Sequence, residues 1–143
     1  MSYSRYLIYL GIISLLLSAF AQAQVPSQQL SPDQKKYLQQ LINEQVTDKS
    51  ALPTVESWSD TKKVAEFICR PFALSTIKKY HKNADKVFLG VGSEESIRLK
   101  PLSELVGIGM YRTDEGWHDI RFSCKLDATG KAQSFNFFPI EEN

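Results

Sequence analysis

Three stretches in the second half of the sequence follow an alternating apolar pattern. They cover residues 105–112, 118–126 and 133–138. Successive side chains of a β-strand point to opposite faces, so each stretch predicts a strand with one buried face. The side chains expected to point inward are Val106, Ile108, Met110, Ile120, Phe122, Cys124, Leu126, Phe135 and Phe137.

The turns between these strands predict their register. A three-residue loop over 114–116 and a four-residue loop over 127–130 are both common ways to close a hairpin. Each loop brings the inward sets of its two strands onto one face, whereas a one-residue slip would separate them. The expected pairs are Thr113 with Trp117, Met110 with Ile120, Leu126 with Lys131, and Phe122 with Phe135.

The first half of the chain predicts helices. Residues 31–34 read Ser-Pro-Asp-Gln, a capping box with proline in the first turn, and an apolar stripe then continues to about Thr47. A second helix is expected over 60–69, with a break or kink at Pro71 and a third helix from there to about Lys82. Residues 87–89 predict a short strand, and 97–99 a small strand or loop. The expected fold is therefore α+β, with N-terminal helices packed on one face of an antiparallel meander.

The N-terminus has the features of a secretory signal peptide. Arg5 precedes an apolar run from Leu7 to Phe20, and Ala21-Gln22-Ala23 offers small residues for cleavage after Ala23. A membrane anchor is the alternative, but a spanning helix needs about 20 apolar residues and this run is shorter. The sequence thus predicts a signal peptide over residues 1–23, one globular domain over 24–143, and a periplasmic or secreted protein without a stable membrane anchor.

Charge argues against two classes of partner. The sequence has 17 basic and 16 acidic residues, and removing Arg5 with the signal leaves equal numbers. Nucleic-acid binding requires a dense basic surface, so no nucleic-acid partner is expected. No basic amphipathic segment suggests binding to a membrane surface.

The two cysteines, Cys69 and Cys124, predict a disulfide. An even number of cysteines in an exported protein favours pairing, and this bridge would close a loop worth about 4 kcal/mol in the chain-entropy model. Two alternatives stay open. A redox-active thiol is less favoured because no Cys-x-x-Cys motif is present, and a zinc site is less favoured because the histidines lack ligand spacing.

A set of short motifs occurs in order over residues 69–137. The motifs are Cys69-Arg70-Pro71, Tyr111-Arg112-Thr113, Gly116-Trp117, Phe122-x-Cys124 and Ser134-Phe135. Together they resemble a family of small exported bacterial proteins of unknown function, which have paired cysteines and an aromatic-rich C-terminal hairpin. Where the family has a second aromatic residue after the tryptophan, this chain has His118. The resemblance implies bacterial export and paired cysteines, and it implies no activity.

No constellation in the sequence predicts catalysis. His118 and Asp119 are adjacent on a strand, so they point to opposite faces and cannot orient one another. His81 lies near a helix end, where a cation suits the helix dipole. Neither a Gly-x-Ser-x-Gly elbow nor a complete dinucleotide-binding loop is present. The sequence therefore predicts no catalytic residues, no metal and no cofactor.

One surface is a candidate for binding. In the predicted register Trp117, Arg121 and Ser123 share the outer face of the sheet with Gly107 and Gly109, and glycines in a strand can allow close approach by another molecule. A helix packed over this face, or a plain solvent-exposed face, are the alternatives. Two functions are consistent with the sequence: a non-catalytic envelope protein that binds a protein or small ligand, and a small periplasmic hydrolase or redox enzyme.

Overall fold

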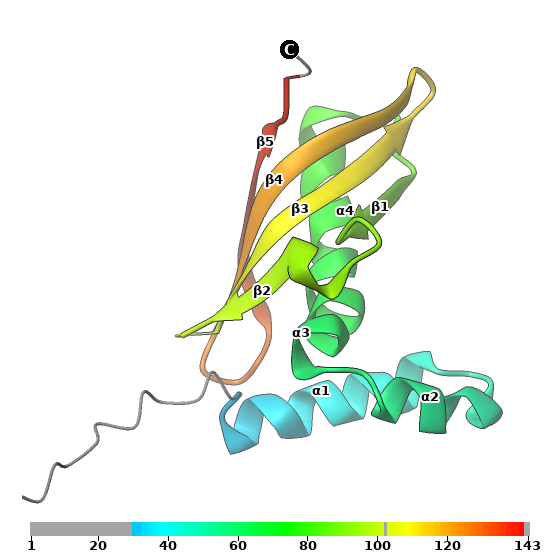
Figure 1. The fold of residues 1–143 in the computed structure, drawn as a ribbon, viewed down its shortest axis with the longest axis vertical. Helices are drawn as coiled ribbons and strands as arrows, with labels where there is room; N and C mark the ends of the chain where they lie inside the picture. Colours follow the sequence, from blue (N-terminus) through cyan, green and yellow to red (C-terminus); the bar gives the residue numbers. More distant parts are fainter. Residues whose placement is uncertain (1–29, 102, 142–143) are drawn as a thin grey trace, which may run out of the picture.

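The computed structural model describes residues 30–101 and 103–141, and the expected signal peptide lies outside them. The described chain forms a five-stranded antiparallel sheet with helices against one face (Figure 1). One disulfide joins Cys69 to Cys124. The α+β fold class and the disulfide are thereby confirmed. None of the described helices is both long and apolar enough to span a membrane.

The elements follow one another along the chain with helices first and strands after. The helical segments are α1 (Pro32–Gln45), η1 (Lys49–Ala51), α2 (Leu52–Glu56), α3 (Asp60–Lys63), η2 (Val64–Cys69) and α4 (Arg70–Tyr80). The strands are β1 (Lys86–Leu89), β2 (Ile97–Lys100), β3 (Glu104–Thr113), β4 (Gly116–Leu126) and β5 (Ala132–Pro139), with a short 3₁₀ turn, η3 (Glu94–Ser96), before β2.

Helix α1 begins where its capping box predicts. The hydroxyl of Ser31 accepts a hydrogen bond from the Gln34 backbone N–H at 3.2 Å, and the Gln34 side chain accepts one from the Ser31 N–H at 2.9 Å. Gln34 is buried, and its amide nitrogen also donates to the backbone oxygen of Asp127 at 2.9 Å. The N-terminus of α1 is thus tied to the turn between β4 and β5.

The expected break at Pro71 is wrong, because α3, η2 and α4 run on as one continuous helix. The segment η2 is π-helical, and the Arg70 N–H donates to the oxygen of Ala65, five residues earlier. Proline lacks the N–H that would bond the carbonyl four residues before it. That carbonyl, of Phe67, instead accepts a hydrogen bond from the Gln45 side chain at 3.3 Å. A π-turn and a side chain from α1 therefore accommodate the proline without a break.

The strands form one sheet in the order β1-β3-β4-β5, and β2 also pairs with β3. Strands β1 and β2 lie end to end along the same edge of β3: Lys86–Leu89 pairs with 109–112, and Ile97–Lys100 with 104–107. Figure 1 shows α4 passing behind the sheet, while no helix lies in front of β3 and β4. Helices therefore cover one face of the sheet in the described residues, and the other face is open.

The predicted register of the first hairpin is wrong by one residue. The loop has two residues, so Thr113 pairs with Gly116 and Arg112 pairs with Trp117. Gly116 does adopt a positive φ of 121°, but as the first residue of β4 rather than inside the loop. The inward residues of β4 are therefore those predicted, whereas in β3 the inward and outward residues are exchanged. The inward residues of β3 are Leu105, Gly107, Gly109 and Tyr111, and the outward apolar residues are Val106, Ile108 and Met110.

The second hairpin keeps the predicted face but not the predicted pairs. Phe135 lies opposite Cys124 rather than Phe122, a shift of two residues, and an irregularity sits between Lys125 and Leu126. The loop has one residue more than predicted, since Leu126 pairs with Ala132. Within it the Asp127 carboxylate accepts hydrogen bonds from the backbone N–H groups of Thr129 and Lys131. Because a shift of two preserves the side-chain alternation, the inward set stays inward.

The core lies between the long helix and the inner face of the sheet. Cys69 and Cys124 are both fully buried, and their bond connects the end of η2 to the C-terminal part of β4. The disulfide therefore fastens the helix to the sheet within the core. The other fully buried large side chains are Ile42, Val64, Ile77, Leu105 and Ile120.

Candidate functional site

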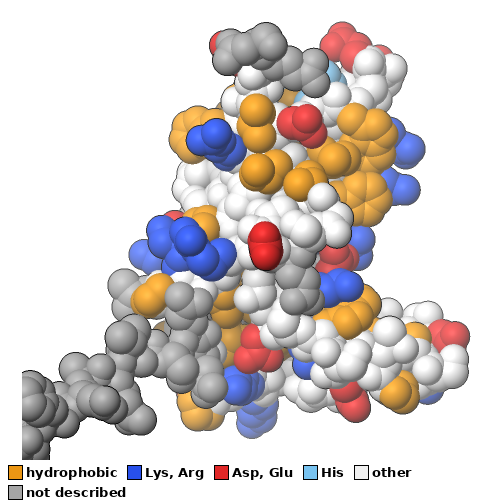
Figure 2. Space-filling view, viewed as in Figure 1, with side chains coloured by type: hydrophobic (Ala, Val, Ile, Leu, Met, Phe, Trp, Pro, Cys, Tyr) orange, Lys and Arg blue, Asp and Glu red, His pale blue; other side chains and the backbone are white. Residues whose placement is uncertain are grey.

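The open face of the sheet carries a strip of apolar side chains that no described helix covers. Trp117 is 45% exposed and Phe138 is 68% exposed, and Phe88 and Ile108 are exposed as well. Large apolar side chains gathered on one face are a recognised mark of interaction surfaces. Figure 2 shows this face, with the apolar side chains in orange and basic side chains at their margins in blue. The term open face is used below for the side of the sheet that no described helix covers. Its apolar strip consists of Phe88, Val106, Ile108, Met110, Trp117 and Phe138.

The indole of Trp117 spans the sheet rather than standing free of it. It reaches across β3 and stacks on the ring of Phe88, with ring centroids 5.4 Å apart. The guanidinium of Arg112 lies 5.6 Å from the Trp117 centroid. Two neighbours therefore engage the indole, so it offers a broad and preorganised apolar surface for side-by-side packing.

An ion pair holds Arg112 in place beside the indole. Its guanidinium donates two hydrogen bonds to the Asp85 carboxylate, at 2.9 and 2.6 Å. These bonds raise the pKa of Arg112 and lower the pKa of Asp85. The pair sits at the surface, so it orients the guanidinium more than it stabilises the fold.

The charges on the open face are predominantly positive. The strands place six basic and two acidic side chains on it, although the whole chain is nearly neutral. Arg112 pairs with Asp85, and Lys100 pairs with Glu104 at 3.4 Å. The other four basic side chains have no ion pair within the described residues, and one of them, Arg121, lies inside the apolar strip, between Ile108 of β3 and Phe138 of β5. The six basic residues are Lys86, Arg98, Lys100, Arg112, Arg121 and Lys125, and the two acidic ones are Glu104 and Asp119.

Of the four residues of the candidate surface predicted from sequence, two lie on the expected outer face of the sheet and two do not. Trp117 and Arg121 lie on the open face, while Gly107 and Gly109 lie on the inner face opposite Phe122 and Ile120. A Cβ at Gly107 would lie 2.3 Å from the Ser96 carbonyl oxygen, and one at Gly109 would lie 2.6 Å from that of Phe88. The glycines therefore admit the protein's own backbone, where the chain passes from β1 to β2, rather than a ligand.

Both histidines meet around one tyrosine at the end of the sheet. The Tyr111 hydroxyl lies 3.2 Å from Nε2 of His81, and the Tyr111 ring stacks on His118 with centroids 4.9 Å apart. His118 Nε2 is also 2.9 Å from the Thr113 hydroxyl. Burial raises the pKa of Tyr111, and the nearby charge of Glu115 raises it further. His118 thus packs on the inner face at half burial.

This cluster lacks the partners that acid–base or nucleophilic catalysis needs. The cavity beside His81, of about 340 Å³, is walled by aromatic and amide side chains and by Pro139, and no carboxylate or thiol from residues 30–101 or 103–141 lines it. Both cysteines are in the disulfide. A working base requires a nucleophile and an orienting group within hydrogen-bond reach. The arrangement of His81, Tyr111 and His118 is that of an aromatic packing cluster.

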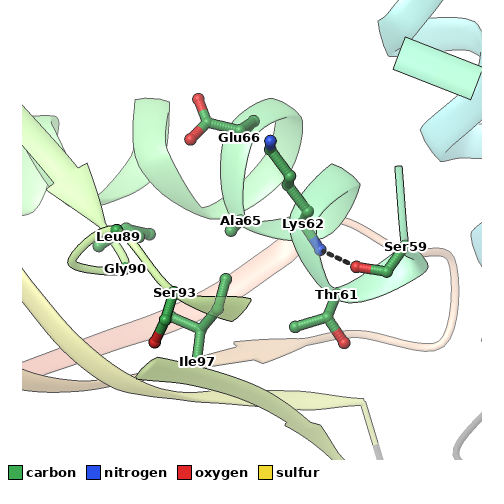
Figure 3. Close-up of a pocket in the computed structure, with 10 residues that line it drawn as sticks. Ser59, Thr61, Lys62, Ala65, Glu66, Leu89, Gly90, Ser93 and Ile97 are labelled. Carbon is green, nitrogen blue, oxygen red and sulfur yellow. Dashed lines mark hydrogen bonds between the residues drawn. The ribbon is translucent and has the colours of Figure 1, made fainter. Parts of the chain in front are cut away.

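A second cavity lies between the first turns of the long helix and the loop that links β1 to β2 (Figure 3). Its volume is about 230 Å³, below the roughly 300 Å³ at which small-molecule pockets begin. Ser59 on its rim caps the helix by accepting from the Lys62 N–H, and Glu66 pairs with Arg70 at 3.2 Å. The polar groups of this cavity thus have structural partners already.

Sequence reasoning missed most of the open face. Arg112 and the outward apolar residues of β3 were assigned to the wrong face or not considered, because the hairpin loop was taken as one residue too long. A usable signal was present: Arg98 and Lys100 alternate with apolar residues in β2, and Lys86 and Phe88 alternate with Val87 and Leu89 in β1.

Comparison of the chain with protein-family models, curated proteins and solved structures finds no match.

Proposed function

We propose that the protein is a non-catalytic binding module of the bacterial envelope, exported to the periplasm or secreted, which captures a partner protein on its open face. The observation that carries the proposal is the uncovered apolar strip around Trp117. Tryptophan, tyrosine and arginine dominate binding energy where a partner desolvates them. Trp117 and Arg112 are already held in place by Phe88 and Asp85, so binding would cost little side-chain entropy.

Charge complementarity supports one class of partner. The basic side chains in and beside the apolar strip are matched by a protein surface that combines apolar and acidic groups. Stacking of nucleobases calls for ring faces that stand free, whereas the Trp117 ring is engaged by Phe88 and Arg112. A folded acidic partner protein therefore fits this surface better than a nucleic acid does.

Three features support export. The N-terminal sequence has a basic residue, an apolar run and a small-residue cleavage site. The disulfide is buried between helix and sheet, and structural disulfides persist in oxidising compartments. The motifs of the C-terminal hairpin also resemble those of exported bacterial proteins.

The alternative of a small hydrolase or redox enzyme gains no support from the geometry. Its sharpest requirement is a pocket that collects the two histidines with a carboxylate or thiol. The histidines do converge on Tyr111, but the cavity beside His81 offers neither group. We therefore retain a single proposed function.

Site-specific photocrosslinking tests the proposal directly. A photoreactive phenylalanine analogue is placed at Trp117 and, as a matched control, at Lys36, which is exposed on α1 away from the sheet. The proposal expects position 117 to crosslink one defined protein through an acidic segment, and Lys36 to give no such product. The product should weaken with added salt and with Arg121→Glu. Equal crosslinking at both positions, or a product indifferent to Arg121→Glu, would contradict it.

A further inference from the structure

Strand β5 is an open edge of the sheet. It pairs only with β4, and the Ile140 N–H donates to the oxygen of Asp119 at 3.0 Å. In an antiparallel pair the bonded and non-bonded positions alternate, so Asn136 and Phe138 bond β4 while Phe135 and Phe137 direct their N–H and C=O groups away from it. Pro139 also occupies a position whose backbone groups point away from β4, so its missing N–H removes no hydrogen bond between β4 and β5.

These outward backbone groups have no hydrogen-bond partner among the described residues. Unpaired N–H and C=O groups along an edge strand form a template for another extended chain. The chemistry that this edge recognises is therefore that of a peptide backbone.

A groove runs along this edge. The cavity of about 340 Å³ is lined by the consecutive residues 135–139 together with Tyr80 and His81 from the end of α4. Consecutive side chains of a strand point to opposite faces, so a cavity that touches all five must follow the free edge. Tyr80 is 73% exposed and flanks the groove on the helix side, and Phe138 flanks it on the side of the open face.

The β5 edge lacks the usual protection against strand pairing. No charged residue occurs in Ala132–Pro139, and its proline is the last residue. The opposite edge of the sheet is protected, since β1 and β2 are short and carry Lys86, Arg98 and Lys100. Natural sheets commonly place lysine, proline or short strands at their edges, so this bare edge is an exception that strand addition would explain.

We propose that the groove along β5 binds an extended peptide segment of a partner protein, which adds to the sheet as a further strand. The segment carries an apolar side chain that packs beside the edge-to-face pair of Tyr80 and Phe137, whose ring centroids lie 5.9 Å apart, and it carries acidic residues as well. Basic residues are neighbours of the groove lining: Lys78 and Lys79 precede Tyr80 in the last turn of α4, and Arg121 pairs with Phe138. Acidic residues, Asp119 and Glu141, lie only at the far end of the strand, beside Ile140.

A second copy of the chain fits the same edge less well. Pairing β5 with itself about a two-fold axis at the groove would bring two α4 ends together, with Lys78, Lys79 and Lys82 of each copy. Like charges placed side by side oppose association. The site is independent of the indole of Trp117, although Phe138 lines the groove and also belongs to the open face.

Amide hydrogen exchange on the exported, disulfide-bonded protein gives the first test. The N–H groups of Phe135 and Phe137 are expected to exchange much faster than those of Asn136 and Phe138, which bond β4. If the Phe135 and Phe137 amides are protected from exchange in the free protein and sedimentation gives the mass of a dimer, the edge binds a second copy of the chain and the peptide proposal is overturned. Protection without a dimer would mean that the edge is not free.

Random linear peptides of about ten residues, displayed on phage, supply the probe for the second test. Enriched peptides are expected to combine apolar and acidic residues and to protect the Phe135 and Phe137 amides. Tyr80→Ala should weaken binding about tenfold or more, while Trp117→Ala and Lys36→Ala should leave it unchanged. Failure to enrich any peptide would overturn the proposal, as would peptides that protect other strands. Because the Trp117 variant keeps this binding, failure here is distinguishable from failure of the proposed function.

Discussion

Replacing Cys69 and Cys124 with alanine is expected to remove a large part of the stability of this domain. The two residues are 55 positions apart, and in the chain-entropy model a closed loop of that length contributes about 4 kcal/mol. Both sulfurs are fully buried, so the small cavities they leave add to the loss. Domains of this size have only about 5–15 kcal/mol to lose.

Urea denaturation of the double variant measures the effect. With a slope of about 2 kcal/mol per molar, the midpoint should fall by about 2 M relative to the disulfide-bonded protein. The matched control is the bonded protein unfolded with reductant present, which should approach the variant, whereas the variant itself should not respond to reductant. A variant within about 1 kcal/mol of the bonded protein would refute the reasoning, as would two labelled thiols in the folded protein purified without reductant.

Three further changes test the fold. Gly107→Ala should lower stability by about 1–3 kcal/mol by thermal melting, because the new methyl would collide with backbone, whereas Ser123→Ala on the open face should be nearly neutral. Gln34→Leu should cost about 1–3 kcal/mol in urea because it removes three hydrogen bonds of this side chain: the one donated to the Asp127 oxygen and those accepted from Ser31 and Ser103. The folded-state pKa of Asp85 is lowered, so its stabilisation exists above pH 3.8 and disappears as the pH falls below that value. Asp85→Asn should therefore flatten the decline of Tm in acid; an unchanged acid profile would count against the ion pair.

Local chemistry made the helical half of the fold predictable. The capping box at Ser31 fixes where α1 starts, and the apolar spacing fixes which of its faces is buried, so both could be predicted without the tertiary structure. Pro71 was misjudged because its effect depends on a distant residue. The side chain of Gln45 accommodates the free carbonyl of Phe67, and no local pattern announces that contact.

The apolar pattern was sufficient to orient β4 but not β3. The inward face of β4 was predicted correctly because Ile120, Phe122 and Cys124 leave no ambiguity. In β3 the outward set is as apolar as the inward set, so either loop length in the first hairpin satisfied the pattern. The two glycines are required where β1 gives way to β2 along β3, a demand of topology that sequence does not display.

The register error in the first hairpin also affected which residues were placed on the candidate surface. Trp117 and Arg121 were placed on the outer face correctly because they alternate with the unambiguous inward residues of β4. Phe88 lies beside the indole only because β1 joins the far edge of β3, which is a long-range pairing. Arg112 lies opposite Trp117 in the hairpin itself, so the loop error alone hid it. A one-residue loop error was enough to move the apolar strip of β3 to the wrong side.

The melting temperature of Trp117→Ala, measured together with capture of the protein crosslinked at position 117, tests the central claim most directly. The indole contacts Phe88 and Arg112 on an open face, so its loss should cost about 1 kcal/mol of stability. The buried control Ile120→Ala should cost about 2–5 kcal/mol. The account predicts that Trp117→Ala melts close to the unaltered protein and no longer captures the partner. A loss of stability like that of the Ile120 control, or capture that survives the change, would contradict it.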